Sequence, residues 1–276
     1  MYIQKTSAYI KPSFGTLDFK AYEYVDYKGN VRKSQCTTAK RNDLNYENTA
    51  DIIIKNFEKY DKVKIMPMNV SDGTEIYFLS DSIIKKIGFK NFKEHFSPII
   101  ASDIYAPVIK SYPKNGIIFL EDAEAAILKE NSANLINKVN VKDYITHILN
   151  PSDINNKKLY KLNPEFQECF KFQILDFQER LKLLRDKGNT VVMIRNSLYH
   201  SFGENEASNI VKNVANKLVK NSLFIIGGYD RMKMPDKFVK TLKIYFDEID
   251  LNVFRKKAIV NNPSKYSIIN ILRNSI

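Results

Sequence analysis

Cysteine and histidine are scarce in this chain of 276 residues, which has two cysteines and three histidines. Cys36 and Cys169 lie far apart, and His95, His147 and His200 are scattered, so no spacing resembles a metal-binding motif. The sequence therefore gives no support for metal catalysis. Two isolated cysteines suit a reducing compartment, and we expect a cytoplasmic protein.

Long apolar runs are also absent. The longest stretches, such as Leu223–Gly228, have the length of a strand and fall far short of the ~20 residues that span a bilayer. Residues 1–10 lack the basic segment followed by an apolar segment that marks a conventional secretory signal. We therefore expect no membrane span.

Acidic residues are fewer than basic residues, 31 against 43, which gives a formal charge of +12. This balance favours contact with nucleic acid, an acidic protein or an anionic membrane surface. The alternative is a solvated, lysine-rich surface without a polyanionic partner. Most arginines are isolated, so nucleic-acid binding rests on charge alone.

Strand and helix patterns alternate along much of the chain. Apolar runs predict five strands, at 63–68, 98–102, 170–175, 190–194 and 222–226. Helical spacing and breakers predict helices at 74–87, 106–112, 177–187 and 205–220. Two more β-rich segments, 242–249 and 253–260, are joined by a turn near Asp250 that is short enough only for an antiparallel pair. The pattern predicts an α/β fold with a doubly wound, Rossmann-like, mostly parallel sheet and an antiparallel C-terminal hairpin.

Three segments lie outside this alternation. Residues 17–35 alternate around Lys28-Gly29-Asn30 and predict a β-hairpin. Asn48 is positioned to cap a helix that runs to about Tyr60. Residues 114–169 are too long for a simple connection and predict a small inserted subdomain. We therefore divide the chain into an N-terminal extension, 1–45, and a main domain, 46–276, that contains the insertion.

Polar residues follow three of the predicted strands, where ligands bind in open α/β sheets. The first group is the turn Asn69-Val70-Ser71-Asp72-Gly73, which leads from a strand directly into a helix and offers unpaired backbone N–H groups to a nucleotide-like ligand. Asp103 ends the second strand, where its carboxylate can accept both hydroxyls of a ribose or cap the helix at Ala106. Arg195 and Asn196 follow the fourth strand.

The other candidates also have two interpretations. Asp72 and Glu75 can bind a cationic ligand or cap the helix that they introduce. Asp176 follows the third strand and, taken alone, is typical of a helix cap. The Asn196 amide can orient a substrate or stabilise a turn.

Five blocks, in order, resemble a known family. Residues Asn69–Tyr77 are similar to the alanine-cysteine-serine-threonine-glycine-glutamate-glutamate-proline-tyrosine signature of the chemotaxis-receptor glutamate methyltransferases, the CheR type. The other blocks that resemble this family are Ile100–Ile104, Tyr160–Asp176, Ile194–Phe202 and Leu223–Gly228. The resemblance spans about residues 37–230 and includes an insertion where the family carries a small subdomain.

The resemblance implies an S-adenosylmethionine-dependent methyltransferase, a transferase that acts on a carboxylate of a protein side chain. It implies that the turn at Ser71–Gly73 lies under the amino-acid part of the cofactor, with Asp103 at the ribose, Asp176 near the adenine and Asn196 near the methyl group. It makes Arg41, Asn196 and Tyr199 the candidate catalytic residues. The implied cofactor-binding residues are Thr37, Arg41, Asn69, Ser71, Asp72, Gly73, Glu75, Asp103, Ile104, Leu175, Asp176, Arg195 and Asn196.

The sequence also departs from the family. Asn69-Val70 replaces the alanine-cysteine pair, Ala39-Lys40 replaces two phenylalanines, and the helical N-terminal domain of the receptor enzymes is not evident. One alternative is therefore a catalytically degenerate CheR-like fold that serves as an interaction protein for an acidic partner. Another, a methyltransferase that acts on nucleic acid, rests only on the charge.

Overall fold

The computed structural model describes residues 22–25, 31–34, 43–104, 106–130, 133–140, 142–144, 157–198, 202–234 and 236–258. Of residues 22–25, 31–34 and 107 only the backbone is described. The predictions for Thr37, Arg41 and Tyr199, and for the turn at 28–30, fall outside these ranges.

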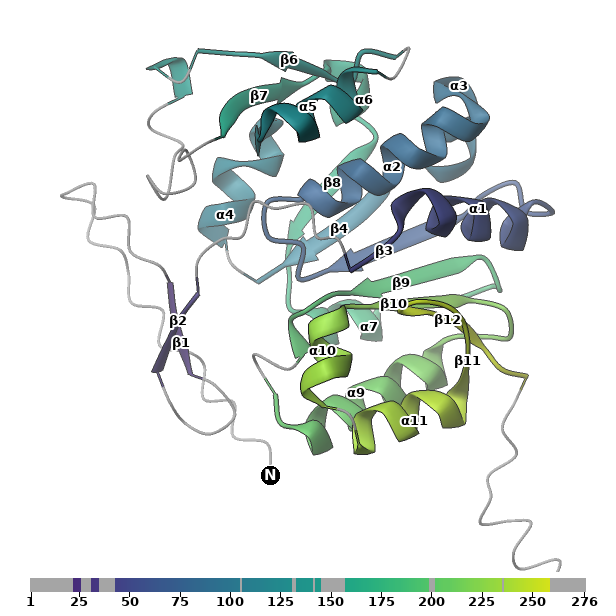
Figure 1. Cartoon of the computed structure of the whole chain (residues 1–276). Helices are drawn as coiled ribbons and strands as arrows, with labels where there is room; N and C mark the ends of the chain where they lie inside the picture. The colour runs from purple at the N-terminus through teal and green to yellow at the C-terminus, as the bar shows by residue number, and fades with distance from the viewer. Residues whose placement is uncertain are drawn as a thin grey trace, which may run out of the picture.

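A seven-stranded sheet in the order β11-β12-β10-β9-β3-β4-β8 forms the centre of the fold (Figure 1). Its strands are β3 (Lys64–Met68), β4 (Ile99–Asp103), β8 (Phe170–Ile174), β9 (Thr190–Ile194), β10 (Leu223–Ile226), β11 (Phe246–Asp250) and β12 (Val253–Lys256). The first five run parallel, and β12 is antiparallel to both β10 and β11. The predicted mostly parallel, doubly wound sheet with an antiparallel C-terminal hairpin is confirmed.

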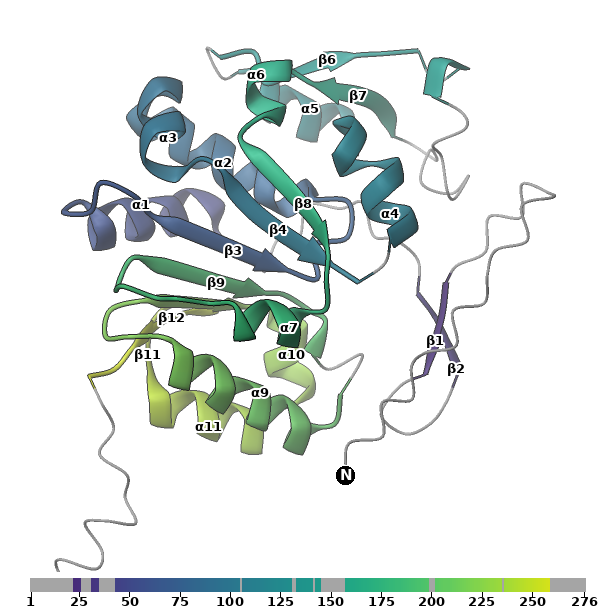
Figure 2. The same cartoon turned by 180° about the vertical axis from the view of Figure 1, so that it is seen from behind.

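Helices cover both faces of this sheet, as the two opposite views show (Figures 1 and 2). One face carries α1 (Tyr46–Phe57), α2 (Thr74–Ile87) and α3 (Phe89–Phe96), and the other carries α7 (Phe177–Lys182), α9 (Glu204–Lys217) and α11 (Lys237–Tyr245). Successive side chains of a strand point to opposite faces, so Leu223 and Ile225 join the first core and Phe224 and Ile226 the second. Strands buried on both faces need continuous apolar runs, which explains the sequence of β9 and β10.

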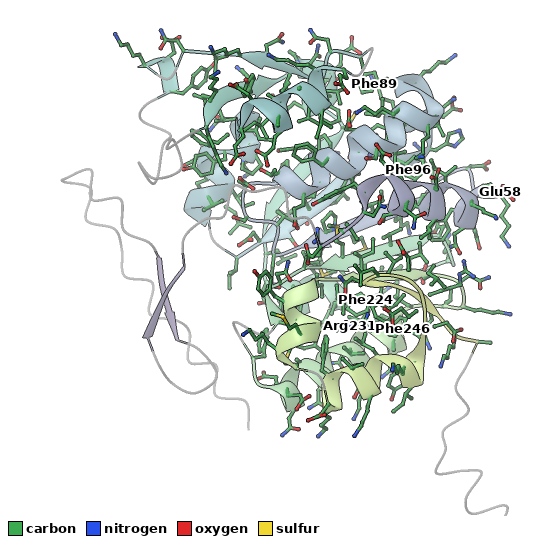
Figure 3. All side chains as sticks on the ribbon, viewed as in Figure 1. Glu58, Phe89, Phe96, Phe224, Arg231 and Phe246 are labelled. Carbon is green, nitrogen blue, oxygen red and sulfur yellow. The ribbon has the colours of Figure 1, made fainter. Side chains whose placement is uncertain are left out.

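Phenylalanines contribute to both cores, and Figure 3 labels Phe96 of the first core and Phe224 and Phe246 of the second. Phe224 of β10 and Phe246 of β11 pack in the second core with ring centroids 5.5 Å apart. Phe92 and Phe96 of α3 stack at 6.0 Å in the first core. The helix α3, which the sequence pattern did not reveal, thus contributes directly to the main core.

The interval predicted as an insertion contains a separate three-stranded antiparallel sheet in the order β5-β7-β6. Its elements and their neighbours are α4 (Ala106–Ser111), η1 (Pro113–Asn115), β5 (Ile117–Leu120), α5 (Asp122–Lys129), β6 (Ile136–Lys138), β7 (Lys158–Leu162) and α6 (Pro164–Gln167). In β5, Ile118 and Leu120 join the first core, whereas Ile117 and Phe119 pack against Val108 of α4. The small sheet is therefore packed on both faces.

The N-terminal hairpin is confirmed as β1 (Tyr22–Val25) and β2 (Val31–Ser34), which pair antiparallel with Val25 opposite Val31. The helix cap predicted at Asn48 is wrong. Asn45 caps α1, and its side chain accepts the backbone N–H of Asn48 at 3.0 Å. An asparagine three residues earlier satisfies the free N–H group, so the helix begins earlier.

Several predicted boundaries are also wrong. Helix α7 ends at Lys182, not at 187, because Asp186 accepts the backbone N–H groups of Gly188 and Val219 and holds the following loop out of helical conformation. Helix α9 ends at Lys217, not at 220. The segment predicted as strand from 242 begins as helix: Phe238, Thr241 and Leu242 are buried at helical spacing in α11, which packs on α9.

Candidate functional site

The carboxyl ends of β3, β4 and β9 meet at one edge of the sheet. Strand β3 lies between β4 and β9, which is where the chain order reverses and where ligands bind in doubly wound folds. The backbone N–H of Ser71, in the turn after β3, donates to Asp103 Oδ2 at 2.8 Å. The predicted turn and the predicted ribose acceptor are therefore in direct contact.

The turn after β3 has an unusual backbone. Asn69, Ser71 and Gly73 adopt positive φ values of 56°, 53° and 84°. A Cβ atom on Gly73 would lie 3.0 Å from Tyr77 Oη and 3.2 Å from Phe172 Cε1. Glycine is thus needed at this position both for its conformation and for the contact with the buried Tyr77 ring.

Asp72, directly before the N-cap residue Gly73, bonds to the first residue of the helix that follows this turn. Its side chain is buried and accepts the Thr74 backbone N–H at 3.1 Å and the Thr74 hydroxyl at 2.9 Å. Burial raises the pKa of the neighbouring Tyr77 hydroxyl, and the Asp72 charge raises it further. Of the two interpretations of Asp72, capping describes its contacts within the chain.

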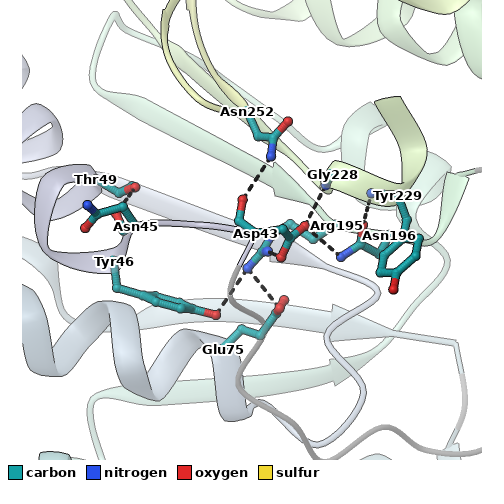
Figure 4. Close-up of polar contacts among 10 residues, drawn as sticks. All are labelled: Asp43, Asn45, Tyr46, Thr49, Glu75, Arg195, Asn196, Gly228, Tyr229 and Asn252. Atoms are coloured by element: carbon teal, nitrogen blue, oxygen red, sulfur yellow. Dashed lines mark hydrogen bonds and ion pairs between the residues drawn. The ribbon is translucent and has the colours of Figure 1, made fainter. Parts of the chain in front are cut away.

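Arg195, directly after β9, is the centre of a buried ion-pair network that we call the Arg195 node (Figure 4). Its side chain is only 2% exposed. Its guanidinium pairs with Asp43, and Nη1 lies 2.8 Å from Glu75 Oε1. Nη1 also donates to the Tyr46 hydroxyl at 3.2 Å. One cation thus joins the end of β9, the first turn of α2 and the start of α1.

Asp43 has the most contacts in this node. Its Oδ2 accepts the Gly228 backbone N–H at 2.6 Å and the Asn196 side-chain amide at 3.2 Å, and its backbone carbonyl accepts the Asn252 amide at 2.9 Å. Burial raises the pKa of Asp43, but the Arg195 charge and the hydrogen bonds from Gly228 and Asn196 outweigh it and hold that pKa below its ordinary value. Asp43 is therefore ionised at neutral pH.

Burial and the neighbouring charges also set the pKa values of Arg195 and Tyr46. Burial lowers the pKa of Arg195, and the charges of Glu75 and Asp43 more than offset it, so the pKa is raised. Burial, followed by the Glu75 charge, raises the pKa of Tyr46. Arg195 is consequently a fixed cation, and the Tyr46 hydroxyl stays protonated.

Asn196 is held at both ends of its amide. Nδ2 donates to Asp43, and Oδ1 accepts the Tyr229 backbone N–H at 2.9 Å. Its φ is 53°, and a Cβ atom on Gly227 would lie 1.9 Å from Asn196 Oδ1. Gly227 thus makes room for this orientation of the amide. The side-chain amide of Asn69, directly after β3, donates to Ser197 Oγ at 3.0 Å.

The ends of β4 and β8 form the other side of the edge. Asp103 pairs in register with Ile174, and the Leu175 backbone N–H donates to the Asp103 carbonyl at 3.0 Å. Ile104, the next residue after Asp103, and Ile174 are 49% and 39% exposed. Asp176 caps α7 through the Gln178 backbone N–H at 2.8 Å.

Several predicted site residues are thus collected at one sheet edge, and Thr37, Arg41 and Tyr199 lie outside the described residues. Sequence reasoning missed Asp43, Tyr46, Gly228 and Asn252, which surround Arg195 and Asn196. One available signal was Arg195 itself. An arginine that directly follows a buried strand needs carboxylate partners, and this need points to acidic residues near the other blocks.

An open cavity of about 450 Å³ adjoins the node. Its lining residues are Asp43, Gly228, Arg231, Met232, Val239, Leu251 and Asn252. Within the described ranges no cluster of three or more metal-ligating side chains occurs. No helix in the described part of the chain is both long and apolar enough for a membrane span.

The family model described as "CheR methyltransferase, SAM binding domain" matches residues 35–246. This match covers more than half of the chain, and the chain belongs to the CheR methyltransferase family. Its cofactor is S-adenosylmethionine, which this domain binds. The resemblance seen in the sequence is confirmed.

Comparison with other proteins adds little beyond the family. No curated protein sequence matches the chain. Two solved structures of WbdD, one described as a bifunctional kinase-methyltransferase and one as a co-crystal with the kinase inhibitor LY294002, are 10% identical, with TM-scores of 0.36 and 0.37. Each match covers 77% of this chain, which spans only 39% and 40% of the WbdD chains.

The residues at the sheet edge fit the cofactor in chemical character. Asp103 provides a carboxylate acceptor suited to a ribose diol at the end of β4. Ile104 and Ile174, after β4 and at the end of β8, provide exposed apolar surface of the kind that suits a purine. When bound, S-adenosylmethionine supplies an electrophilic methyl group. The protein is then expected to bind the cofactor, to orient it toward the methyl acceptor and to exclude water from the site.

Proposed function

We propose that this protein transfers the methyl group of S-adenosylmethionine to a carboxylate oxygen of a protein side chain. The observation that carries the proposal is the contact of Asp103 with the turn after β3, at the reversal of strand order. A ribose acceptor and a strand-to-helix turn meet there, in a chain whose family binds this cofactor. The cysteine usage of the sequence also suits a cytoplasmic enzyme.

Methyl transfer needs alignment of two groups more than it needs a strong acid or base. Ser71–Gly73, Asp103 and Asp176 are the residues that we assign to the cofactor. Asn196, held in one orientation by Asp43 and by the Tyr229 N–H, provides a fixed polar group at the end of β9. By family resemblance, Arg41 neutralises the acceptor carboxylate and Tyr199 lines its approach.

Titration calorimetry with S-adenosylmethionine tests the cofactor assignment through Asp103. Asp103→Asn removes the charge from the hydrogen bonds to a ribose. Charge-assisted bonds of this kind contribute roughly 1.5–3 kcal/mol, so we expect the Kd to rise about 10- to 100-fold. Asp51→Asn is the control, because Asp51, on α1, pairs with Lys86 of α2 and its side chain is 61% exposed. An unchanged Kd for Asp103→Asn would refute the assignment of Asp103.

The acceptor is tested separately with S-adenosylmethionine labelled in its methyl group. A methyl ester on a carboxylate is hydrolysed by mild base, whereas methyl groups on nitrogen remain. We expect a base-labile label on proteins of a cell lysate. A base-stable label, or label on nucleic acid, would contradict the proposed acceptor and leave cofactor binding intact.

One observation favours a second function, an interaction protein without turnover. Arg195 and Asn196 match the family's arginine-asparagine block, yet both are engaged within the chain. In such a protein the fold is kept and the basic surface binds an acidic partner. Normal folding without any rise in melting temperature on addition of S-adenosylmethionine would favour this function, because a ligand that binds only the folded state must stabilise it.

A further inference from the structure

Asp43 precedes the first helix and belongs to no strand of the sheet, yet it contacts the carboxyl ends of β9 and β10 and the turn between β11 and β12. Its carboxylate holds Arg195 and Asn196, and its backbone carbonyl holds the Asn252 side chain. A single residue thus brings the segment before α1 against the edge of the sheet where the site lies.

The contacts of Asp43 extend to the turn after β3 through Arg195. That guanidinium has two carboxylate partners, Asp43 and Glu75, and Glu75 lies in the first turn of α2, directly after the turn. Without the Asp43 charge, Glu75 would be the one carboxylate partner left to Arg195 among the described residues, and the Asn196 Nδ2 would lose its charged acceptor. Arg195 and Asn196, which match the family's arginine-asparagine block, therefore share one carboxylate that holds both.

We propose that Asp43 is a positioning residue for the cofactor site. It orients Asn196 directly and orients Glu75 through Arg195. The inference rests on the proposed function, because it assigns a role within the same site. Asp43 itself is assigned no contact with the cofactor.

The chain offers a matched control at the opposite end of the same strands. Asp186 accepts the Gly188 backbone N–H at 2.8 Å, the Val219 backbone N–H at 2.8 Å and the Ser222 hydroxyl at 2.6 Å. Gly188 precedes β9 and Ser222 precedes β10, so Asp186 joins loops at the amino ends of the strands whose carboxyl ends Asp43 joins. A purely structural carboxylate is expected to behave like Asp186.

The test compares Asp43→Asn with Asp186→Asn in two measurements: calorimetric titration with S-adenosylmethionine and unfolding in urea. We expect both variants to lose stability. Only Asp43→Asn should weaken binding, by about tenfold or more, with the Kd of Asp186→Asn within threefold of the wild-type value. If the Kd of Asp43→Asn also stays within threefold, Asp43 is structural only and the proposal is wrong.

A second variant is used if Asp43→Asn does not fold. Asn252 has a φ of 63°, so Asn252→Gly keeps the left-handed backbone and removes only the amide that holds the Asp43 carbonyl. We expect a smaller rise in the Kd, about threefold to fivefold, and an unchanged Kd would overturn the proposal. A folded wild-type protein that does not bind S-adenosylmethionine would instead refute the proposed function, and this inference with it.

Discussion

Removal of the Arg195 cation is the most direct perturbation of the node. Arg195→Met keeps an unbranched apolar side chain and leaves the carboxylates of Asp43 and Glu75 without their shared partner. Removing one partner of a buried ion pair costs about 3–5 kcal/mol. The two carboxylates are 22% and 21% exposed, so solvent screens part of this penalty and we expect a loss near 3 kcal/mol.

Urea unfolding at neutral pH measures this loss, and Arg231→Met provides its control. Arg231 pairs with Glu248 in the same way, but these side chains are 31% and 30% exposed. Pairs near the surface contribute about 1 kcal/mol or less. A loss for Arg195→Met no larger than that for Arg231→Met would refute the view of the node as a buried ion pair.

The pH dependence gives an independent check of the same reasoning. The pKa of Asp43 is lowered in the folded protein, so its contribution to stability is present above the unfolded value of about 3.9 and is lost as the pH falls through the folded pKa. Arg195→Met lacks this contribution. The difference in stability between wild type and variant should therefore stay near its neutral value down to about pH 4 and shrink as the pH falls further, through the lowered pKa of Asp43. A difference that stays constant below about pH 4 would contradict the assigned cause.

Two further predictions concern the turn after β3. Gly73→Ala should lower the free energy of unfolding in urea by more than about 1 kcal/mol, because Gly73 has a φ of 84° and a Cβ atom there would lie 3.0 Å from Tyr77 Oη. An unchanged free energy of unfolding would show that the turn tolerates a side chain at this position. Tyr77→Phe should be neutral or stabilising by up to about 1 kcal/mol, because the buried Tyr77 hydroxyl has no hydrogen-bond partner among the residues that the structure describes. A loss of 2 kcal/mol or more in the same assay would mean that this hydroxyl makes a stabilising contact.

Local sequence determined much of the architecture. The apolar runs of β3, β9 and β10, the helix of α2 from Thr74 to its end at Gly88, and the short turn after Asp250 each depend on a few neighbouring residues. Burial on both faces demands apolar strands, and a short connection allows only an antiparallel pair. The turn at 69–73 and Asp103 could be assigned to one edge because parallel strands end on the same side.

Other features depended on contacts between distant parts of the chain. Helix α7 stops where Asp186 binds groups near residues 188, 219 and 222, and no local signal marks that end. Asp43 and Arg195 are 152 positions apart, and Asp43 and Asn252 are 209 apart. Burial of a charge creates a need for a partner without specifying which residue provides it. The sequence by itself determined the sheet and the polar ends of its strands, whereas only the tertiary structure decided that Asp43 holds the arginine and the asparagine at one of those ends.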